Sequence, residues 1–487
     1  MRRFLFYFVL MALAVVLISC ASDSNVSTVN NDGISANVDD SLEETTAGRK
    51  PLTIPVINYD GYEFVTLSFN KGKFGTWFQY LDFGWSDDFA GELINDAVYT
   101  RNMIVEERYN ITIKNIENAD PYTVARKSLT AGDTEYDIIS PYIDRAFTLS
   151  QENLLKDFYT VPYMDLDQEW WDQAILRDLS LNRKIYVLMG DITLGNKELN
   201  YGIFFNKKLI DEYHLDNPYQ LVRDNKWTLA AISEMGRLVT HDLNGDGILD
   251  ENDVYGVLSD YSSAPVWYFS FGERMSIINS SGAPELCMNG SRTVNVMQKL
   301  SEFLCDKQIV INARDTKSSW TGLDNMLMEE RGLFRAASIY DITFYRAMIN
   351  DFGVLPFPKF DEMQEVFTNE IATWAACGIS IPYNNLDFER TGLILEALAY
   401  ESKETVLKAY YDINLYTKVA RDVESEEMFN IIFNSKCYDL CFTFNWGGLV
   451  DVLRTAAKDG SRYTSLYEAA ESKALAAMEK AYEYFLD

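Results

Sequence analysis

Strand-like and helix-like patterns alternate along the chain after residue 50, and no other feature restricts its fold as strongly. Short apolar, β-branched runs typical of strands cover 63–69, 136–143 and 184–190, and the run 200–215 begins as a strand and continues as a helix. Apolar residues at helical spacing predict helices over 96–111, 227–240, 390–413 and 465–487. Because strands and helices alternate without a repeat period, we predict an α/β protein with helices on the faces of its sheets.

The first twenty residues have the layout of a secretory signal. Two arginines precede an apolar run from Phe4 to Ile18, which is short for a membrane span. The stretch LISC at 17–20 resembles the lipobox of bacterial lipoproteins, and this resemblance implies cleavage before Cys20 and attachment of a diacylglycerol to its sulfur. We predict a signal peptide at 1–19 and a lipid anchor at Cys20, because two acyl chains hold a protein stably on a bilayer surface. An ordinary signal peptide with a chance cysteine is the alternative.

Composition indicates how the folded part relates to the membrane. Residues 20–50 are rich in Ser, Asn, Asp, Thr and Gly and cannot bury enough apolar surface to offset the entropy lost on ordering, so we expect a flexible tether. No later apolar run approaches the roughly 18 residues of a span, so the lipid would be the only membrane contact, on the extracellular face of the cell membrane. The chain has 73 acidic and 43 basic residues, a formal charge of −30, which disfavours nucleic acid as a partner.

The stretch DLNGDGILDEND at 242–253 has the spacing of a calcium-binding loop of the EF-hand type. Oxygen ligands for a hard cation would come from Asp242, Asn244, Asp246, Ile248 (through its carbonyl), Asp250 and Asp253. A helical pattern precedes the loop, but the VYGVLSDY that follows is β-like, so a sensor that opens a pair of helices is not expected. We predict one structural calcium ion that fixes a helix to a strand; an acidic surface turn without metal is the alternative.

The cysteine and histidine content limits the disulfide and catalytic chemistry that the protein can use. If lipidation uses Cys20, five cysteines remain, and an odd number cannot all pair, so disulfides do not frame the fold. The two histidines, His214 and His241, are better explained as structural residues than as catalytic ones. The chain has no glycine-rich phosphate loop and no nucleophile elbow. We therefore expect no catalysis by histidine, by a phosphate loop or by a nucleophile elbow.

Several motifs are weak alone but informative in their order: NDAVYTRN, VEERYNI, GDTEYDIISPYID, GDITLGNKELNYGIFFNKKLIDEYHLDNPYQLVRDNKWTL, the calcium-like loop, FGVLPFPKFDEMQE and ISIP. Together they resemble the extracellular solute-binding lipoproteins of bacterial ABC importers (family 1, carbohydrate-type, clostridial-like members) over residues 51–487. The resemblance implies a type II periplasmic-binding-protein fold, in which two α/β lobes are joined by a hinge and a ligand is trapped in the interlobe cleft. It assigns 51–185 and 352–400 to the N-terminal lobe, and 186–351 and 401–487, with the calcium-like loop, to the C-terminal lobe.

By this resemblance, the protein is not an enzyme: it is a monomer that captures a small solute, expected to be an oligosaccharide, and delivers it to an ABC permease. Sugars present apolar C–H faces and a rim of hydroxyls, so their sites need aromatic rings beside carboxylates, amides and arginine. Residues of these types in loop-like contexts are the expected ligand contacts: Trp85, Asp87, Asp88, Asp144, Arg145, Asp191, Trp267, Tyr268, Tyr340, Asp341, Trp374 and Trp446. For any single tryptophan, packing in the core is an equally good interpretation.

Two other functions remain open. The 73 acidic residues leave room for a glycoside hydrolase that uses paired carboxylates. The other alternative is a surface adhesion or scaffold lipoprotein, because dockerin modules carry loops like 242–253. Dockerins have two such loops, each followed by a helix, whereas this chain has one, followed by β-like sequence.

Overall fold

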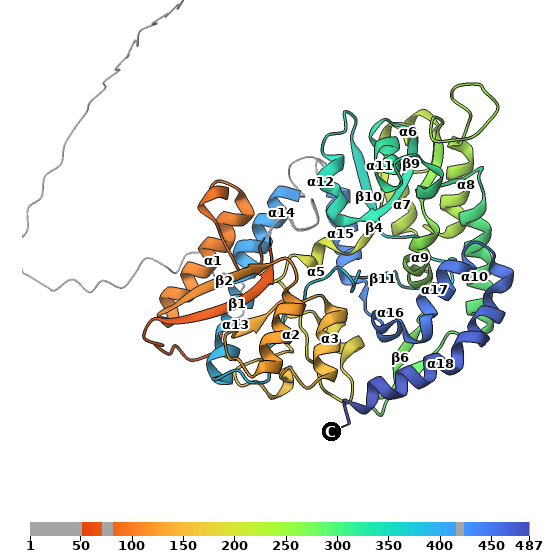
Figure 1. Ribbon diagram of the computed structural model, residues 1–487. Coiled ribbons are helices and arrows are strands. Elements are labelled where there is room, and N and C mark those ends of the chain that lie inside the picture. The colour runs from red at the N-terminus through yellow and green to blue at the C-terminus, as the bar shows by residue number, and fades with distance from the viewer. Residues whose placement is uncertain (1–50, 71–80, 415–422, 487) are drawn as a thin grey trace, which may run out of the picture. The chain divides into compact units, whose positions relative to one another are not determined.

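In the computed structural model, which describes residues 51–70, 81–414 and 423–486, the first sheet has three parallel strands in the order β2-β1-β3 (Figure 1). Its strands are β1 (Tyr62–Phe69), β2 (Ile111–Asn118) and β3 (Ile138–Ile139). The helices α1 (Leu93–Tyr109) and α2 (Pro121–Ala131) precede and follow β2, as parallel crossovers require. The strand predicted at 63–69 is confirmed. Of the strand predicted at 136–143, only β3 is formed, and the last residue of that run is the first residue of α3 (Ile143–Gln151).

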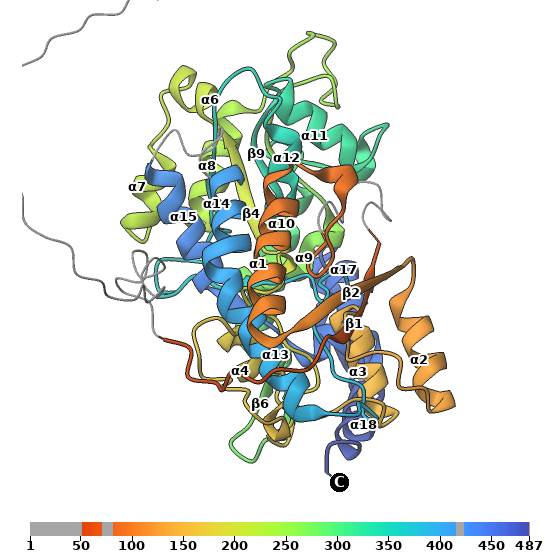
Figure 2. The ribbon, with the colours of Figure 1, turned by 90° about the vertical axis from the view of Figure 1, so that its left-hand side faces the viewer.

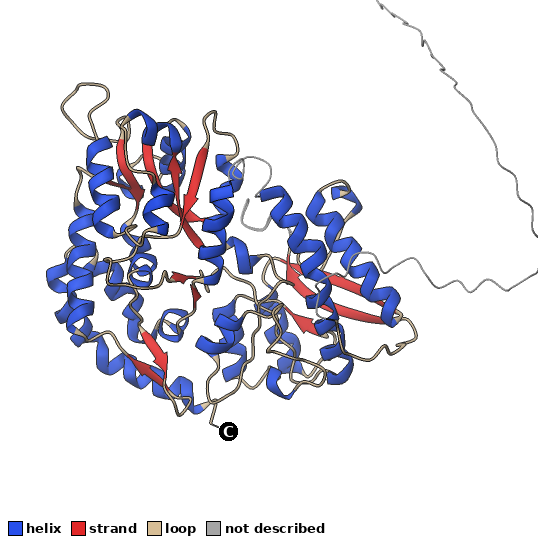
Figure 3. Ribbon diagram, turned by 180° about the vertical axis from the view of Figure 1, so that it is seen from behind, coloured by secondary structure: helices blue, strands red, loops and turns tan. Residues whose placement is uncertain are grey.

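The second sheet has five strands in the order β10-β4-β9-β5-β8. Figure 3 shows the strands in red with helices packed around them. Its strands are β4 (Tyr201–Asn206), β5 (Tyr255–Ser259), β8 (Val310–Asn312), β9 (Gly332–Ser338) and β10 (Phe352–Leu355). β9 lies in the centre, antiparallel to β4 and parallel to β5, and β10 pairs antiparallel with β4. The predicted transition from strand to helix over 200–215 is confirmed by β4 and α6 (Lys207–Glu212).

One helix approaches this sheet unusually closely. A Cβ built on Gly256 of β5 would lie 2.1 Å from the Cα of Gly236 in α8 (Leu229–Val239), so position 256 requires glycine for the helix to rest on the strand. The hydroxyl of Thr228 accepts a hydrogen bond from the backbone N–H of Ala231, 3.4 Å away. The predicted helix at 227–240 and its threonine cap are thus confirmed.

The remaining elements complete the layers around the two sheets. The helices are α4 (Gln173–Leu179), α5 (Gly195–Glu198), α7 (Pro218–Arg223), α9 (Ala264–Ser270), α10 (Ser291–Cys305), α11 (Trp320–Met328), α12 (Ile342–Tyr345), α13 (Phe388–Ser402), α14 (Lys408–Asn414), α15 (Val423–Asn434), α16 (Leu440–Phe444), α17 (Leu449–Ala456) and α18 (Tyr463–Glu483). The short strands are β6 (Ser276–Ile278), β7 (Pro284–Leu286), β11 (Asn369–Glu370) and β12 (Lys436–Cys437).

Within the described residues, three segments pass between the two sheets. One passage leads from Leu188, bridged to Ile379 beside the first sheet, to β4; the second leads from β10 to Ser380, bridged to Ile139 of β3. The third follows α15 and contains β12, which pairs parallel with β11 of the second passage. A buried ion pair fixes the third passage, since Nζ of Lys436 lies 2.7 Å from Oδ2 of Asp172. The predicted strand 184–190 is not formed, because these residues make only isolated bridges to the passing segments.

A late part of the chain packs on an early one. α13 continues through a π-helical turn, η6 (Lys403–Leu407), into α14, and all three lie beside α1 (Figure 2). Val98 of α1 is fully buried in a small apolar cluster with Val406 and Tyr410. Thus α14 belongs with the first sheet although the predicted lobe boundary lies at 400, and β10 belongs to the second sheet although 352–400 was assigned to the other lobe. The division into lobes stays a prediction.

Three further predictions concern the chain ends and the thiols. The predicted signal peptide, the lipid anchor at Cys20 and the tether lie outside the described residues. Among the helices of the described segments, none combines the length and apolar character needed to cross a bilayer. The described part of the chain has five cysteines, and none of them is paired in a disulfide with another: Cys287, Cys305, Cys377, Cys437 and Cys441.

Candidate functional site

A cavity of about 520 Å³ lies beside the five-stranded sheet and is lined by two partly exposed tryptophans. Trp320 is the first residue of α11 and is 40% exposed; Trp374 lies in a turn after β11 and is 45% exposed. The volume is within the range of small-molecule sites, about 300–1,000 Å³. Exposed indole faces on the wall of one cavity are suited to covering an apolar ligand surface, because each ring offers a large rigid area.

A buried arginine anchors one wall of the cavity. Arg335 lies in the central strand β9 and its Nη2 is 2.9 Å from Oδ1 of Asp324. The same carboxylate oxygen accepts a hydrogen bond from the hydroxyl of Tyr345 at 2.8 Å. The Arg335 guanidinium also lies over the ring of Trp320, 5.5 Å from its centroid. Charge, hydrogen bonds and an aromatic ring therefore converge on a single guanidinium.

A second carboxylate, Asp341, lines the cavity at the end of η5 (Ile339–Asp341). Its Oδ2 accepts hydrogen bonds from the backbone N–H and the hydroxyl of Ser338, both at 3.0 Å. Burial raises the pKa of Asp341 to about 6, although the positive charge of Arg335 opposes this shift. The neighbouring Tyr340 is buried and packs edge-on against Phe344, with ring centroids 6.0 Å apart.

Formal charges in the cavity cancel. Its charged lining residues are Asp324, Asp341, Arg335 and Arg454. Arg454 of α17 lies 3.3 Å from Asp451, and its side chain remains 41% exposed. Around these groups lie hydroxyls and apolar side chains, including Ser262 and Val266. Such a lining suits a neutral ligand with many hydroxyl groups better than a strongly charged one.

Of the predicted ligand contacts, three line this cavity: Tyr340, Asp341 and Trp374. The structure corrects the prediction for Trp267 and Tyr268, because α9 places both side chains fully in the core. Trp267 packs on Phe357, with centroids 4.8 Å apart, and its indole N–H donates to the hydroxyl of Ser259 at 3.2 Å. Trp446 is corrected for the same reason, since it is 3% exposed and stacks on a phenylalanine of α16.

The other predicted contacts lie outside this cavity, on the side of the three-stranded sheet, and stay predictions. Trp85 is 43% exposed and meets Tyr99 edge-on, at 4.6 Å between centroids. Asp144 and Arg145 open α3 and lie 3.9 Å apart, while Asp191 lies 3.9 Å from a lysine of α5. Exposed carboxylates complete this set: Asp87 and Asp88.

Sequence reasoning missed Trp320, Asp324 and Arg335. A signal for the last was present, because an arginine inside the apolar run GLFRAAS at 332–338 contradicts a fully buried strand unless it has a partner. Its partner could not be named, since α11 and β9 meet only through tertiary packing. Trp320 and Asp324 are four residues apart, so they share one face of the helix.

The loop at 242–253 joins α8 to β5, as the calcium hypothesis required, but its carboxylates are engaged by backbone N–H groups. Asp242 accepts from Gly245 at 2.6 Å and from Gly247 at 2.7 Å, and these bonds lower its pKa. Asp253 is fully buried and accepts from the N–H groups of Leu243 and Asp250. Within the described segments, no three His, Cys, Asp or Glu side chains are grouped as metal ligands would be. The calcium ion therefore stays a prediction from spacing.

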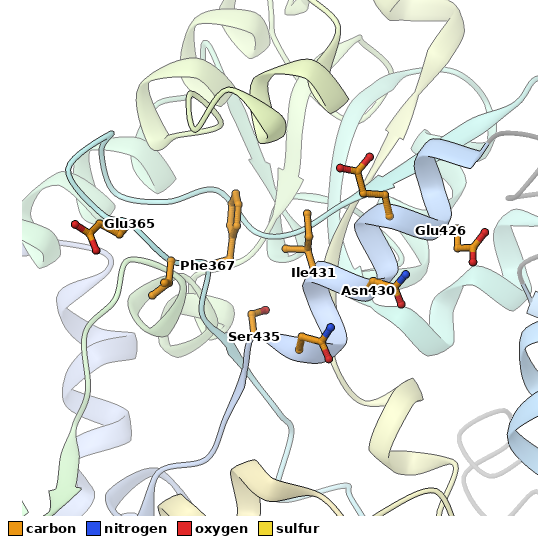
Figure 4. Close-up of a pocket in the computed structure, with 9 residues that line it drawn as sticks. Glu365, Phe367, Glu426, Asn430, Ile431 and Ser435 are labelled. Atoms are coloured by element: carbon orange, nitrogen blue, oxygen red, sulfur yellow. The ribbon is translucent and has the colours of Figure 1, made fainter. Parts of the chain in front are cut away.

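A second hollow, of about 700 Å³, lies between α15 and the loop at 365–367 (Figure 4). Phe367 and Ile431 form apolar lining, while Glu365, Glu426 and Asn430 supply carboxylate and amide groups. The hollow contains no tryptophan, tyrosine or arginine among its lining residues. It lacks the paired aromatic surfaces that distinguish the first cavity.

Comparison with known proteins gives a likeness in fold. No protein-family model matches the sequence, and no curated protein is significantly similar to it. The structure is similar to the cyclic α-maltosyl-1,6-maltose binding protein of Arthrobacter globiformis, with a TM-score of 0.57, 14% identity and coverage of 86% of this chain and 99% of that one. The chain has the fold of ABC-type solute-binding proteins.

Two further solute-binding structures agree. An ABC substrate-binding protein from Listeria monocytogenes in complex with cycloalternan has a TM-score of 0.53 at 12% identity, over 86% of this chain and 100% of that one. A family 1 extracellular solute-binding protein from Bifidobacterium longum subsp. infantis has a TM-score of 0.52 at 14% identity, over 86% and 98%. The predicted α/β solute-binding fold is thereby confirmed, and the tryptophan-lined cavity is the candidate ligand site within it.

Proposed function

We propose that the protein captures a neutral oligosaccharide in the cavity lined by Trp320 and Trp374 and releases it chemically unchanged. The observation that carries this proposal is the joint presence of two partly exposed indole rings and a charge-balanced set of polar side chains around one cavity. Indole rings cover the apolar faces of sugars, and carboxylates and guanidinium groups satisfy their hydroxyls. The similar structures support it, since one is a cyclic maltosyl-maltose binding protein and another was solved with cycloalternan.

Titration calorimetry with maltotetraose and with cycloalternan tests the proposal directly. We expect saturable binding of at least one of these neutral sugars, and mass spectrometry should recover the ligand unaltered. Trp374→Ala should weaken this binding, because it removes a ring that lines the cavity. Trp85→Ala is a matched comparison, since Trp85 is almost as exposed but lies outside the cavity. Loss of binding in W85A alone would move the site to the three-stranded sheet.

The same experiment decides the hydrolase alternative. Two carboxylates, Asp324 and Asp341, line one cavity, and burial raises the pKa of the second to about 6. A glycoside hydrolase needs one acid that holds its proton and one carboxylate that is ionised. Shortened sugars in the recovered ligand would establish hydrolysis, and their loss in an Asp341→Asn variant would assign the acid.

Anchoring and delivery are also proposals. We infer that Cys20 carries the lipid and that the bound sugar passes to an ABC permease at the outer face of the membrane. Cells that express a Cys20→Ser variant should release the protein into the medium and should no longer incorporate labelled fatty acid into it. Retention of a labelled C20S protein on the membrane would refute the anchor.

A further inference from the structure

We propose that Arg335 is a positioning residue: one guanidinium holds both the Trp320 ring and the Asp324 carboxylate in place for the ligand. This inference rests on the proposed function and names the part of the cavity that contacts the sugar. Arg335 itself is only 2% exposed, so it acts through the two side chains that it contacts.

The backbone of Arg335 is held on both sides. Within β9 it pairs with Phe204 of β4 and with Leu258 of β5. Its Nη1 also donates to the carbonyl of the next residue, Ala336. A side chain that projects from the central strand of a sheet has a fixed origin, so its guanidinium can serve as a rigid support.

The guanidinium determines which oxygen of Asp324 a ligand can use. Oδ1 of Asp324 accepts hydrogen bonds from Nε of Arg335 at 3.0 Å and from the hydroxyl of Tyr345 at 2.8 Å, and Nη2 of Arg335 forms an ion pair with it at 2.9 Å. No hydrogen bond to Oδ2 is formed by the described residues, and this oxygen is not among the buried atoms without a partner. Asp324 lines the cavity, so Oδ2 is an accessible acceptor whose orientation Arg335 sets.

The guanidinium also sets the orientation of Trp320. The ring lies over the guanidinium carbon at 5.5 Å from its centroid, yet the residue is 40% exposed, so it retains surface for a ligand. Trp320 and Asp324 are separated by one turn of α11, which puts their Cβ atoms about 5–6 Å apart. A sugar ring has this scale: an apolar face can cover the indole while a hydroxyl of the same ring donates to Oδ2.

A double-mutant cycle in the full protein tests the proposal, with maltotetraose as the probe. Arg335→Lys keeps the positive charge but loses the planar fork. We expect R335K to bind the probe about tenfold more weakly, the scale of one cation–π contact. In a W320F background, R335K should weaken probe binding much less, because the ring that Arg335 supports is already altered. Independent, multiplying effects of R335K and W320F would overturn the proposal.

A readout without ligand separates this inference from the proposed function. The difference in acrylamide quenching between the protein and its W320F variant reports on Trp320 alone. R335K should make Trp320 easier to quench, whether or not any sugar binds. Unchanged quenching would overturn the role of Arg335, whereas failure of all sugars to bind, with raised quenching, would count against the proposed function only.

A matched control comes from the first sheet. Arg390 likewise lies over a ring, that of Tyr62, at 3.5 Å from the centroid, and pairs with Asp137 at 3.6 Å, but these residues do not line the cavity. Arg390→Lys should change neither Trp320 quenching nor probe binding. Arg335→Gln serves as a second variant. If both R335K and R335Q failed to fold while R390K folded, Arg335 would be a structural residue and the proposal would be wrong.

Discussion

Replacement of Glu198 by glutamine should make the protein more stable at neutral pH. Glu198 ends α5 and directly precedes Leu199, which lines the cavity. Its side chain is buried, with the residue 8% exposed. Burial raises its pKa to about 8, the negative charge of Asp82 adds to this effect, and Arg346 opposes it. The folded protein therefore holds this carboxyl in its neutral form.

The sign and size follow from proton linkage. An acid whose pKa is higher in the folded state supports the fold fully below its unfolded pKa, here 4.5, and loses that support as pH rises to about 8. Over this window the free energy of unfolding falls by about 1.4 kcal/mol per pH unit, which makes about 3 kcal/mol at pH 7. Glutamine has no proton to lose. The advantage of E198Q over the original protein should thus grow by about 3 kcal/mol between pH 4.5 and pH 7.

Urea unfolding followed by tryptophan fluorescence at pH 5, 6, 7 and 8 measures this difference. Glu285 is exposed, so an E285Q variant is the matched control for the replacement of a carboxyl by an amide. Curves for E198Q and the original protein that run parallel from pH 5 to pH 8 would refute the reasoning. In that case the Glu198 carboxyl would be ionised in the folded protein.

Three other changes have definite expected outcomes. Trp374→Ala should weaken oligosaccharide binding by up to about 100-fold in calorimetry, because covering 45% of a ring surface of about 250 Å² gains about 3 kcal/mol; an unchanged Kd would contradict this. Trp267→Ala should lower the unfolding free energy by about 3–5 kcal/mol, since it empties a fully buried site; a loss below 1 kcal/mol would contradict the core assignment. Asp242→Ala with Asp246→Ala removes acceptors of loop N–H groups in any buffer, so the melting temperature should fall further with calcium than in chelator; an equal loss in both would reject the metal.

Elements with a clear period were predictable from the sequence. The clearest case is α8, whose apolar residues Ile232, Met235 and Val239 recur at helical spacing and are all buried. The strand predicted at 184–190 was wrong, because a buried apolar segment has the same composition whether it joins a sheet or makes only single β-bridges. Trp267 misled in the opposite way, since PVWYFSFGE reads as a loop but forms the buried α9.

The lining of the candidate ligand site was less predictable from the sequence, because its residues come from distant segments of the chain. Trp320 and Arg335 belong to neighbouring elements, but Trp374 lies on a passage between the sheets and Arg454 on a late helix. Each has a local sequence that fits a surface position as well as a ligand contact. Only the structure, which places all four residues on one cavity, favours a ligand contact over an ordinary surface position.

The packing of α13 and α14 on α1 has a consequence for synthesis. The first sheet is complete in sequence by residue 139, but most of the side chains that cover Val98 on the apolar face of α1 (Val406, Leu407 and Tyr410) are made after 387. During translation or export, roughly 250 further residues must emerge before these side chains can pack on α1. Until then, the N-terminal part of the chain exposes apolar surface. A protein cut before residue 388 should therefore aggregate, and a factor that shields exposed apolar surface should act on the early segment.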